Sequence, residues 1–137
     1  MTSLQSTTVL VGRILLGLIF VLSGFAKISG FDGTAGYIAS KGLPLPQLLA
    51  ALTIVVELGG GLALMAGLYT RQAVIALAGF SLLTAVVFHN FWAAPQADQM
   101  GQQINFMKNL AIAGGMLVLA AFGPGRLSVD ARRLAAA

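Results

Sequence analysis

The 137-residue sequence contains no cysteine and only one histidine. The lack of cysteine excludes disulfides, thiol redox relays, persulfide carriage and cysteine-bound iron–sulfur clusters within this chain. A single histidine excludes haem ligation by two histidines of one protomer and a self-contained histidine-rich site, so we predict no metal site. The sequence also lacks the spacings of a nucleophilic triad, a phosphate loop or a dinucleotide fingerprint.

Charged residues are scarce as well, at 9% of the chain against 58% hydrophobic residues. A soluble domain usually carries about a quarter charged residues, so lipid is expected to be the main solvent here. The eight Lys and Arg outnumber the four Asp and Glu, but they are scattered along the chain, mostly near the ends of apolar runs. That pattern is typical of membrane orientation and does not indicate a nucleic-acid partner.

Four apolar segments each approach the ~20 residues that a bilayer core requires. They run over about 8–28, 46–68, 71–92 and 104–122. Backbone groups in lipid must be satisfied within the segment, so each is predicted to be a helix. We therefore predict an all-α membrane protein: a bundle of four transmembrane helices in a single domain, residues 1–137. The long first run, with Arg13 inside it, favours an uncleaved span over a signal peptide.

The connections predict further structure. A short amphipathic helix is expected between the first two spans, capped by Asp32 and ended by Gly42 and Pro44. Its apolar face would contain Phe31, Ala35 and Ile38, lying on or in the outer leaflet. The short link between the second and third spans predicts an antiparallel hairpin.

Small residues suggest where helices meet. Gly59, Ala63 and Gly67 are spaced four residues apart in the second span, which predicts a close-packing seam. Such seams also raise the hypothesis of a homo-oligomer.

Loop charges predict orientation. With a cytoplasmic N-terminus, the basic residues on that side would be Arg13, Arg71, Arg126, Arg132 and Arg133. The opposite side would carry Lys27 and Lys41, or three basic residues if Lys108 is included. This bias places both termini in the cytoplasm.

Glu57 is the residue that most needs an explanation, because it is the only charge in the second apolar run. A carboxylate at that depth requires a partner or a purpose. At ~1.5 Å rise per residue, Glu57 lies about 16 Å deep and Lys108 about 6 Å deep. Lys108 from the outer side and Arg13 from the inner side are then both within reach. The alternatives are a register-fixing ion pair and a group that hydrogen-bonds a ligand or accepts its proton.

Polar and aromatic residues gather at the outer ends of the later spans. His89 is read either as an interface histidine or as a proton-exchanging group. Lys108 either extends its ammonium to the membrane surface or binds a ligand. Asn109, the next residue, adds a hydrogen-bonding group. Trp92 belongs either to an interfacial belt or to a ring-binding wall. The candidate ligand-binding residues are therefore Glu57, His89, Lys108, Lys27, Arg13, Asn109 and Trp92.

Three stretches occur in the order RILLGLIFVLSGFAKISGF, VELGGGLALMAGLYTR and INFMKNLAIAGGMLVLAAFGPGRLSVD. Their most specific parts are Ser23-Gly24-x-x-Lys27, Glu57 with the glycines after it, and the closing GPGRLSVD. Over Val9 to Asp130 the chain resembles the DoxX family of small bacterial inner-membrane proteins. The resemblance implies a four-helix bundle with cytoplasmic termini. It also implies a redox setting, since the family is named for a subunit of a thiosulfate:quinone oxidoreductase and other members are associated with quinone or catechol detoxification.

Two hypotheses follow. In the first, the protein binds a lipid-soluble redox molecule such as a quinone in the outer half of the bundle. Lys108 and His89 would donate hydrogen bonds to its carbonyl, while Glu57 pairs with a cation or relays a proton. In the second, it is a non-enzymatic membrane anchor or assembly partner for a soluble oxidoreductase.

Overall fold

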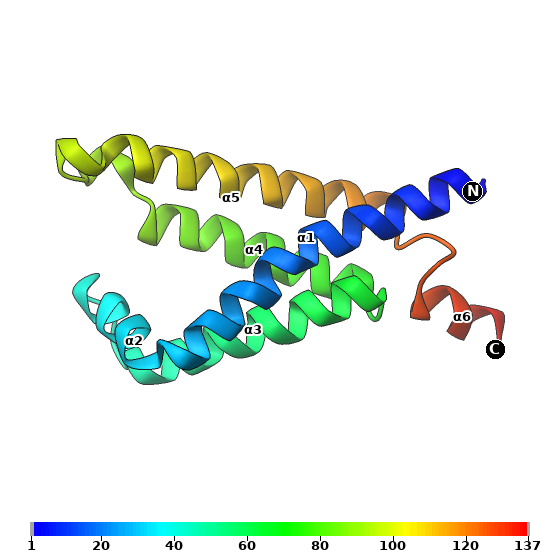
Figure 1. Ribbon diagram of the computed structural model, residues 1–137, viewed down its shortest axis with the longest axis horizontal. Helices are drawn as coiled ribbons and strands as arrows, with labels where there is room; N and C mark the ends of the chain where they lie inside the picture. Colours follow the sequence, from blue (N-terminus) through cyan, green and yellow to red (C-terminus); the bar gives the residue numbers. More distant parts are fainter. Residues whose placement is uncertain (1, 137) are drawn as a thin grey trace.

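The computed structural model describes residues 2–136, and all regular structure within that range is helical (Figure 1). The elements are α1 (Ser3–Ser29), α2 (Phe31–Ser40), α3 (Pro46–Ala66), α4 (Thr70–Phe88), the 3-10 turn η1 (Phe91–Ala93), α5 (Gln96–Phe122) and α6 (Val129–Ala135). Four of them, α1, α3, α4 and α5, are long and apolar enough to cross a membrane. The predicted all-α fold with four membrane-spanning helices is confirmed.

The bundle consists of two helix pairs. α1 packs mainly on α3, and α4 mainly on α5, while α3 and α4 join the pairs. The apolar core lies where the pairs meet and includes Phe20, Leu64, Leu77 and Met116. Toward α2 the pairs diverge (Figure 1). Many large apolar side chains face outward along all four helices, as expected for a surface solvated by lipid.

Close approach of α1 and α3 depends on glycines other than the predicted ones. A Cβ at Gly17 would lie 2.8 Å from the carbonyl oxygen of Gly61, and one at Gly24 would lie 2.7 Å from Leu58 Cγ. The seam predicted at Gly59, Ala63 and Gly67 does not form as a continuous helix contact among the described residues. Gly59 is exposed with no heavy atom within 4 Å of an added Cβ, whereas Gly67, the C-cap of α3, is buried against Arg13. Spacing alone identifies a stripe of small residues but not the side of the helix that meets a partner.

The helix that contains the fourth predicted span, α5, begins at Gln96, eight residues before the apolar run that starts at Ile104. Pro95 precedes this start, and the first turns are rich in Gln, which is a good helix former despite its polarity. The apolar run marks the part suited to lipid, and the helix continues past it.

The amphipathic helix between the first two spans is present as α2. Ala35 and Ile38 are buried against Ala50 of α3, with Phe31 and Phe88 packed beside them. Its apolar face thus covers protein, and the expected contact of that face with the leaflet is wrong. Gly30 is the N-cap in place of Asp32, which lies in the first turn, and the chain leaves α2 through Gly42 at φ +73°.

Both described ends of the chain, the α3–α4 turn and α6 lie at the end of the bundle opposite α2 (Figure 1). Asp130 of α6 caps the start of α4, accepting hydrogen bonds from the backbone nitrogens of Tyr69 and Thr70, both at 2.8 Å. Thr70 Oγ1 donates a third bond at 2.8 Å. Burial alone would raise the pKa of Asp130, but these hydrogen bonds and the nearby charge of Arg133 outweigh it and lower the pKa below its usual value.

Candidate functional site

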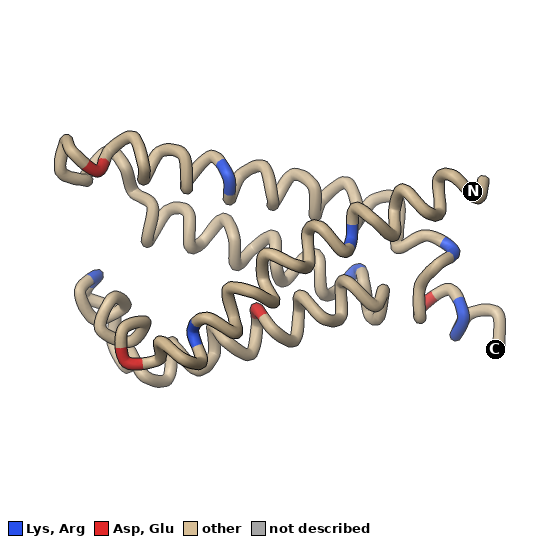
Figure 2. Tube along the Cα trace, viewed as in Figure 1, with Lys and Arg blue, Asp and Glu red and all other residues tan. Residues whose placement is uncertain are grey.

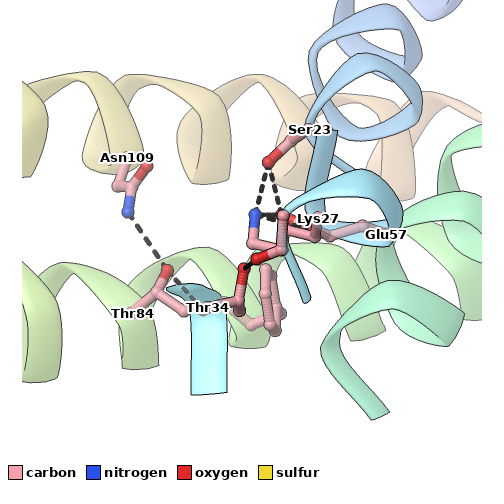
Figure 3. A network of polar contacts seen from close by, with 8 residues as sticks. Ser23, Lys27, Thr34, Glu57, Thr84 and Asn109 are labelled. Carbon is pink, nitrogen blue, oxygen red and sulfur yellow. Dashed lines mark hydrogen bonds and ion pairs between the residues drawn. The ribbon is translucent and has the colours of Figure 1, made fainter. Parts of the chain in front are cut away.

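Glu57 is buried in the middle of α3 and forms an ion pair with Lys27 of α1. Lys27 Nζ lies 2.9 Å from Glu57 Oε2 and donates a hydrogen bond to Oε1 at 3.1 Å. The Oε2 contact is ionic without hydrogen-bond geometry, since this oxygen accepts no such bond within the described residues. Ser23 Oγ donates to Oε1 at 3.0 Å and accepts from Lys27 Nζ at 2.6 Å (Figure 3). The carboxylate, the ammonium and the hydroxyl therefore form a closed triangle.

The sequence positions this triangle through helix spacing. Ser23 and Lys27 are four residues apart, so both lie on one face of α1. Gly24, between Ser23 and Lys27 in the sequence, packs against Leu58, the residue that follows Glu57. The absence of a side chain at Gly24 lets the backbones of α1 and α3 approach at the level of the ion pair. A Cβ at Gly24 would lie 3.3 Å from the backbone nitrogen of Leu58, so a larger residue would separate Lys27 from its partner.

A cavity of about 270 Å³ lies beside the ion pair, in the region where the two helix pairs diverge. Its walls include Ser23, Lys27 and Glu57 on one side and Thr84, His89 and Asn109 on the other. Aromatic rings of Phe20, Phe80 and Phe88 supply apolar lining. A mostly apolar cavity with a few converging polar groups is the usual form of a small-molecule site.

The wall formed by α4 and α5 carries its own polar groups. Asn109 Nδ2 donates to Thr84 Oγ1 at 3.1 Å (Figure 3). The single hydroxyl proton of Thr84 is shared between the carbonyl oxygens of Phe80 at 2.9 Å and Ser81 at 3.1 Å. His89 Nδ1 lies 2.9 Å from Gln102 Oε1, which orients the imidazole at the end of α4. The second ring nitrogen has no partner in the hydrogen bonds formed by residues 2–136.

α2 closes the cavity at the end of the bundle opposite the described chain ends (Figure 1). Thr34, Tyr37 and Ile38 line it. Tyr37 Oη donates to the carbonyl oxygen of Phe88 at 3.1 Å, so α2 is tied to the end of α4. Lys41 Nζ adds a hydrogen bond to Asn90 Oδ1 at 3.3 Å. These links span the gap between the α1–α3 pair and the α4–α5 pair.

Arg13 lies at the other end of the bundle and does not reach Glu57. Arg13 is 1% exposed, and its Nη2 donates to the carbonyl oxygen of Leu127. Among the described residues, Nε and Nη1 have no hydrogen-bond partner, and Arg13 forms no ion pair. The charge of Asp130 acts on it from beyond ion-pair distance. The predicted approach to Glu57 from below is therefore wrong, because Arg13 is held by the segment that leads into α6.

Lys108 and Trp92 also lie outside the cavity lining. Lys108 is exposed on α5, and Trp92 is 57% exposed in an aromatic cluster with Phe91 and Phe106, with ring centroids 5.3–5.8 Å apart. The expected pairing of Lys108 with Glu57 is wrong. Depth along a helix sets the level of a side chain but not its direction around the axis.

The structure thus brings together Glu57, Lys27, His89 and Asn109 from the sequence candidates. It adds Ser23, Thr34, Tyr37 and Thr84, which the sequence reasoning did not select. A signal for Thr84 existed, since Phe80, Thr84 and Phe88 recur at four-residue spacing on one helix face. No comparable signal identified Tyr37, because its partner is a backbone carbonyl.

Comparison with known proteins gives consistent matches. The model of the DoxX family matches residues 8–90. The chain is 43% identical over 130 residues to inner membrane protein YqjF of Escherichia coli strain K12, covering 95% of both chains. It is 42% identical over 124 residues to inner membrane protein YphA of the same organism, covering 90% of this chain and 88% of the relative.

A more distant match is the Bacillus subtilis strain 168 protein named "Putative oxidoreductase CatD", 34% identical over 75 residues, or 55% of this chain and 54% of that one. No solved structure matches the chain. The family match covers more than half of the chain, and two relatives match nearly their whole length. The chain therefore belongs to the DoxX family and is an integral membrane protein related to inner-membrane proteins.

Proposed function

We propose that this protein binds a lipid-soluble aromatic redox compound, most simply a quinone, in the cavity beside Glu57. The observation that carries the proposal is the pairing of a mostly apolar cavity with polar groups on opposite walls. Lys27 and Ser23 lie on one wall, and Asn109, Thr84 and His89 lie on the other. A quinone has an apolar ring with carbonyl oxygens at opposite edges, which matches that distribution.

The size of the cavity supports a single-ring ligand. An engineered cavity of about 150 Å³ holds benzene, so the 270 Å³ here accommodates one ring with substituents. Ile19 lines the cavity and is 47% exposed on the lipid-facing surface. A ligand dissolved in the bilayer would enter at this position without crossing water.

The ion pair gives the ligand a fixed donor. Glu57 holds the Lys27 ammonium at the cavity wall, and an ammonium has three N–H donors. Two of these are directed to Ser23 and Glu57, which leaves one for a carbonyl oxygen of the ligand. In this proposal His89 exchanges a proton with the ligand at the opposite wall.

Electrons would reside on the ligand and on a partner protein, because a chain without cysteine cannot use thiols to carry them. The relative named as an oxidoreductase supports a redox setting. We also propose a bacterial inner-membrane location with both termini cytoplasmic. Both described ends of the chain lie at one end of the bundle (Figure 1). Arg71, Arg126 and Arg133 line a hollow there, and Arg132 lies on α6 beside them.

Equilibrium binding of a short-chain benzoquinone to the purified protein in neutral detergent tests the proposal. We expect Lys27→Met and Glu57→Gln each to weaken binding about tenfold or more, since each removes a charge-assisted contact or its anchor. Lys108→Met is the matched control, because it removes the same charge from an exposed position outside the cavity.

Equal affinity in all four proteins would refute this site. Absence of binding to the wild-type chain, together with co-purification of a soluble oxidoreductase from membranes, would instead support a membrane anchor or assembly partner. A homo-oligomer stays a prediction that the same purification addresses.

A further inference from the structure

A second hollow lies at the opposite end of the bundle, between the end of α5, the start of α4 and α6. Its volume is about 680 Å³. Leu119, Phe122 and Leu134 contribute apolar surface, and Arg71, Arg126 and Arg133 contribute cationic side chains. It shares no lining residue with the quinone cavity and is independent of the function proposed for that cavity.

The arginines keep their positive charge available. The ion pair formed by residues 2–136 is the one between Lys27 and Glu57, so none of the three arginines is neutralised by a carboxylate contact. Asp130 also lines the hollow, but its oxygens already accept three hydrogen bonds from Tyr69 and Thr70. The hollow therefore has a net cationic rim.

One of these arginines is already oriented. The Arg133 guanidinium carbon lies 5.1 Å from the centroid of the Tyr69 ring. Stacking of this kind fixes the guanidinium plane while leaving N–H donors free at its edge. A fork of donors held in one plane suits the oxygens of a phosphodiester.

The apolar part of the hollow continues into the lipid-facing surface. Phe122 is 82% exposed at the end of α5, and Val118 is exposed one turn before it. The basic residues at this end lie beside the ends of the membrane-spanning helices (Figure 2). A ligand that fills both parts needs an anion joined to an acyl chain.

We propose that this hollow binds an anionic phospholipid, with its phosphodiester between Arg71, Arg126 and Arg133 and an acyl chain along the end of α5. A zwitterionic lipid is disfavoured because its ammonium would face three guanidinium groups. Binding ties α6 to α4 and α5, so the lipid stabilises the folded bundle through mass action.

Thermal unfolding of the full chain in neutral detergent, with added lipids of matched acyl chains, tests this proposal. We expect phosphatidylglycerol to raise Tm in a concentration-dependent way, while phosphatidylcholine and inorganic phosphate leave it unchanged. Arg126→Gln and Arg133→Gln should each weaken phosphatidylglycerol binding about fivefold, as expected for one basic residue near an anionic headgroup. Arg132→Gln is the matched control, since Arg132 is exposed on α6 but does not line the hollow.

Loss of binding in Arg132→Gln equal to that in Arg133→Gln would indicate diffuse attraction to net charge and overturn the site. An equal Tm increase with phosphatidylcholine would show that the charge is not recognised. An equal increase with inorganic phosphate would show a site for free anions in place of lipid. Arg126→Gln, in the loop before α6, keeps the test valid if Arg133→Gln fails to fold.

Discussion

Glu57 and Arg13 are both charged side chains buried in the α1–α3 pair, but their surroundings differ. Arg13 is 1% exposed, packs against Gly67, and donates to the carbonyl oxygen of Leu127. Glu57 is 5% exposed, has both an ion partner and a hydroxyl donor, and lines a cavity of about 270 Å³. Both charged side chains are buried, but Glu57 lines a cavity, whereas Arg13 lines neither of the two hollows described above.

Glu57 and Arg13 are both costly to bury, but they have different roles in the bundle. Near the described chain ends, the Arg13 side chain is packed within the protein and joins α1 to the segment before α6 through Leu127. Beside the cavity, the Glu57 carboxylate is paired with Lys27 and also lines a space that can hold another molecule. Because insertion of a central charge costs ~2.5–3.5 kcal/mol, both require compensation. We infer that the neighbouring volume, and not burial, distinguishes the candidate site.

The largest expected effect is at the terminal end, in Gly67→Ala. Gly67 has φ +70°, and its added Cβ would overlap the guanidinium of Arg13 and lie 2.5 Å from Ser128 Cβ. We expect a loss of about 3 kcal/mol or more in the free energy of unfolding, from backbone strain and overpacking together. Circular dichroism during heating in detergent measures it. Gly59→Ala, with open space around the added Cβ, should change Tm little; equal behaviour of the two variants would refute the tight packing around Arg13.

The second effect is at the cavity end, in Lys27→Met. This change leaves the Glu57 carboxylate buried with Ser23 as its remaining donor. We expect destabilisation of up to about 3 kcal/mol, reduced by the partial exposure of Lys27. Adding Glu57→Gln should recover part of the lost stability but not quinone binding. A double variant less stable than Lys27→Met would contradict the proposed pairing.

A smaller effect is expected from Asp130→Ala, which removes the cap of α4 and should cost about 1–2 kcal/mol at neutral pH. Hydrogen bonds lower the pKa of Asp130 below 3.8 in the folded protein, so its contribution is present above that pH and is lost as pH falls through the folded pKa. The difference in Tm between wild type and variant should therefore shrink on acidification from about pH 6 to about pH 3. A difference that is constant with pH would show that the charge of Asp130 is irrelevant.

The smallest effect is expected from Tyr37→Phe, which removes the hydrogen bond between α2 and the Phe88 carbonyl. A loss of about 1 kcal/mol or less is expected, with faster amide hydrogen exchange confined to α2. Tyr69→Phe is the control, since the Tyr69 hydroxyl forms no hydrogen bond with the described residues. Faster exchange throughout the bundle would show that α2 is part of the core and not a separate cover.

The sequence predicted the four spans because apolar runs of ~20 residues have few alternatives in lipid. It did not reveal that the helix of the fourth span begins before the apolar run, at Gln96, because the first turns of that helix are polar. For the candidate site, Glu57 could be recognised as costly, and Lys27 was among the residues selected near it. Lys108 could not be rejected from depth alone, because its direction around α5 depends on which face packs against α4. The cavity itself had no sequence signature, because it arises where two helix pairs diverge.

The role of α2 has a further consequence. Tyr37 and Lys41 join the two helix pairs at the α2 end of the bundle, while Lys27 and Glu57 lie on α1 and α3. In the proposed site, α2 limits the size of the ligand, whereas α1 and α3 supply the charged groups that recognise it. Substitutions in the ten residues of α2 can then alter which ring sizes are admitted while the charged recognition group is inherited unchanged.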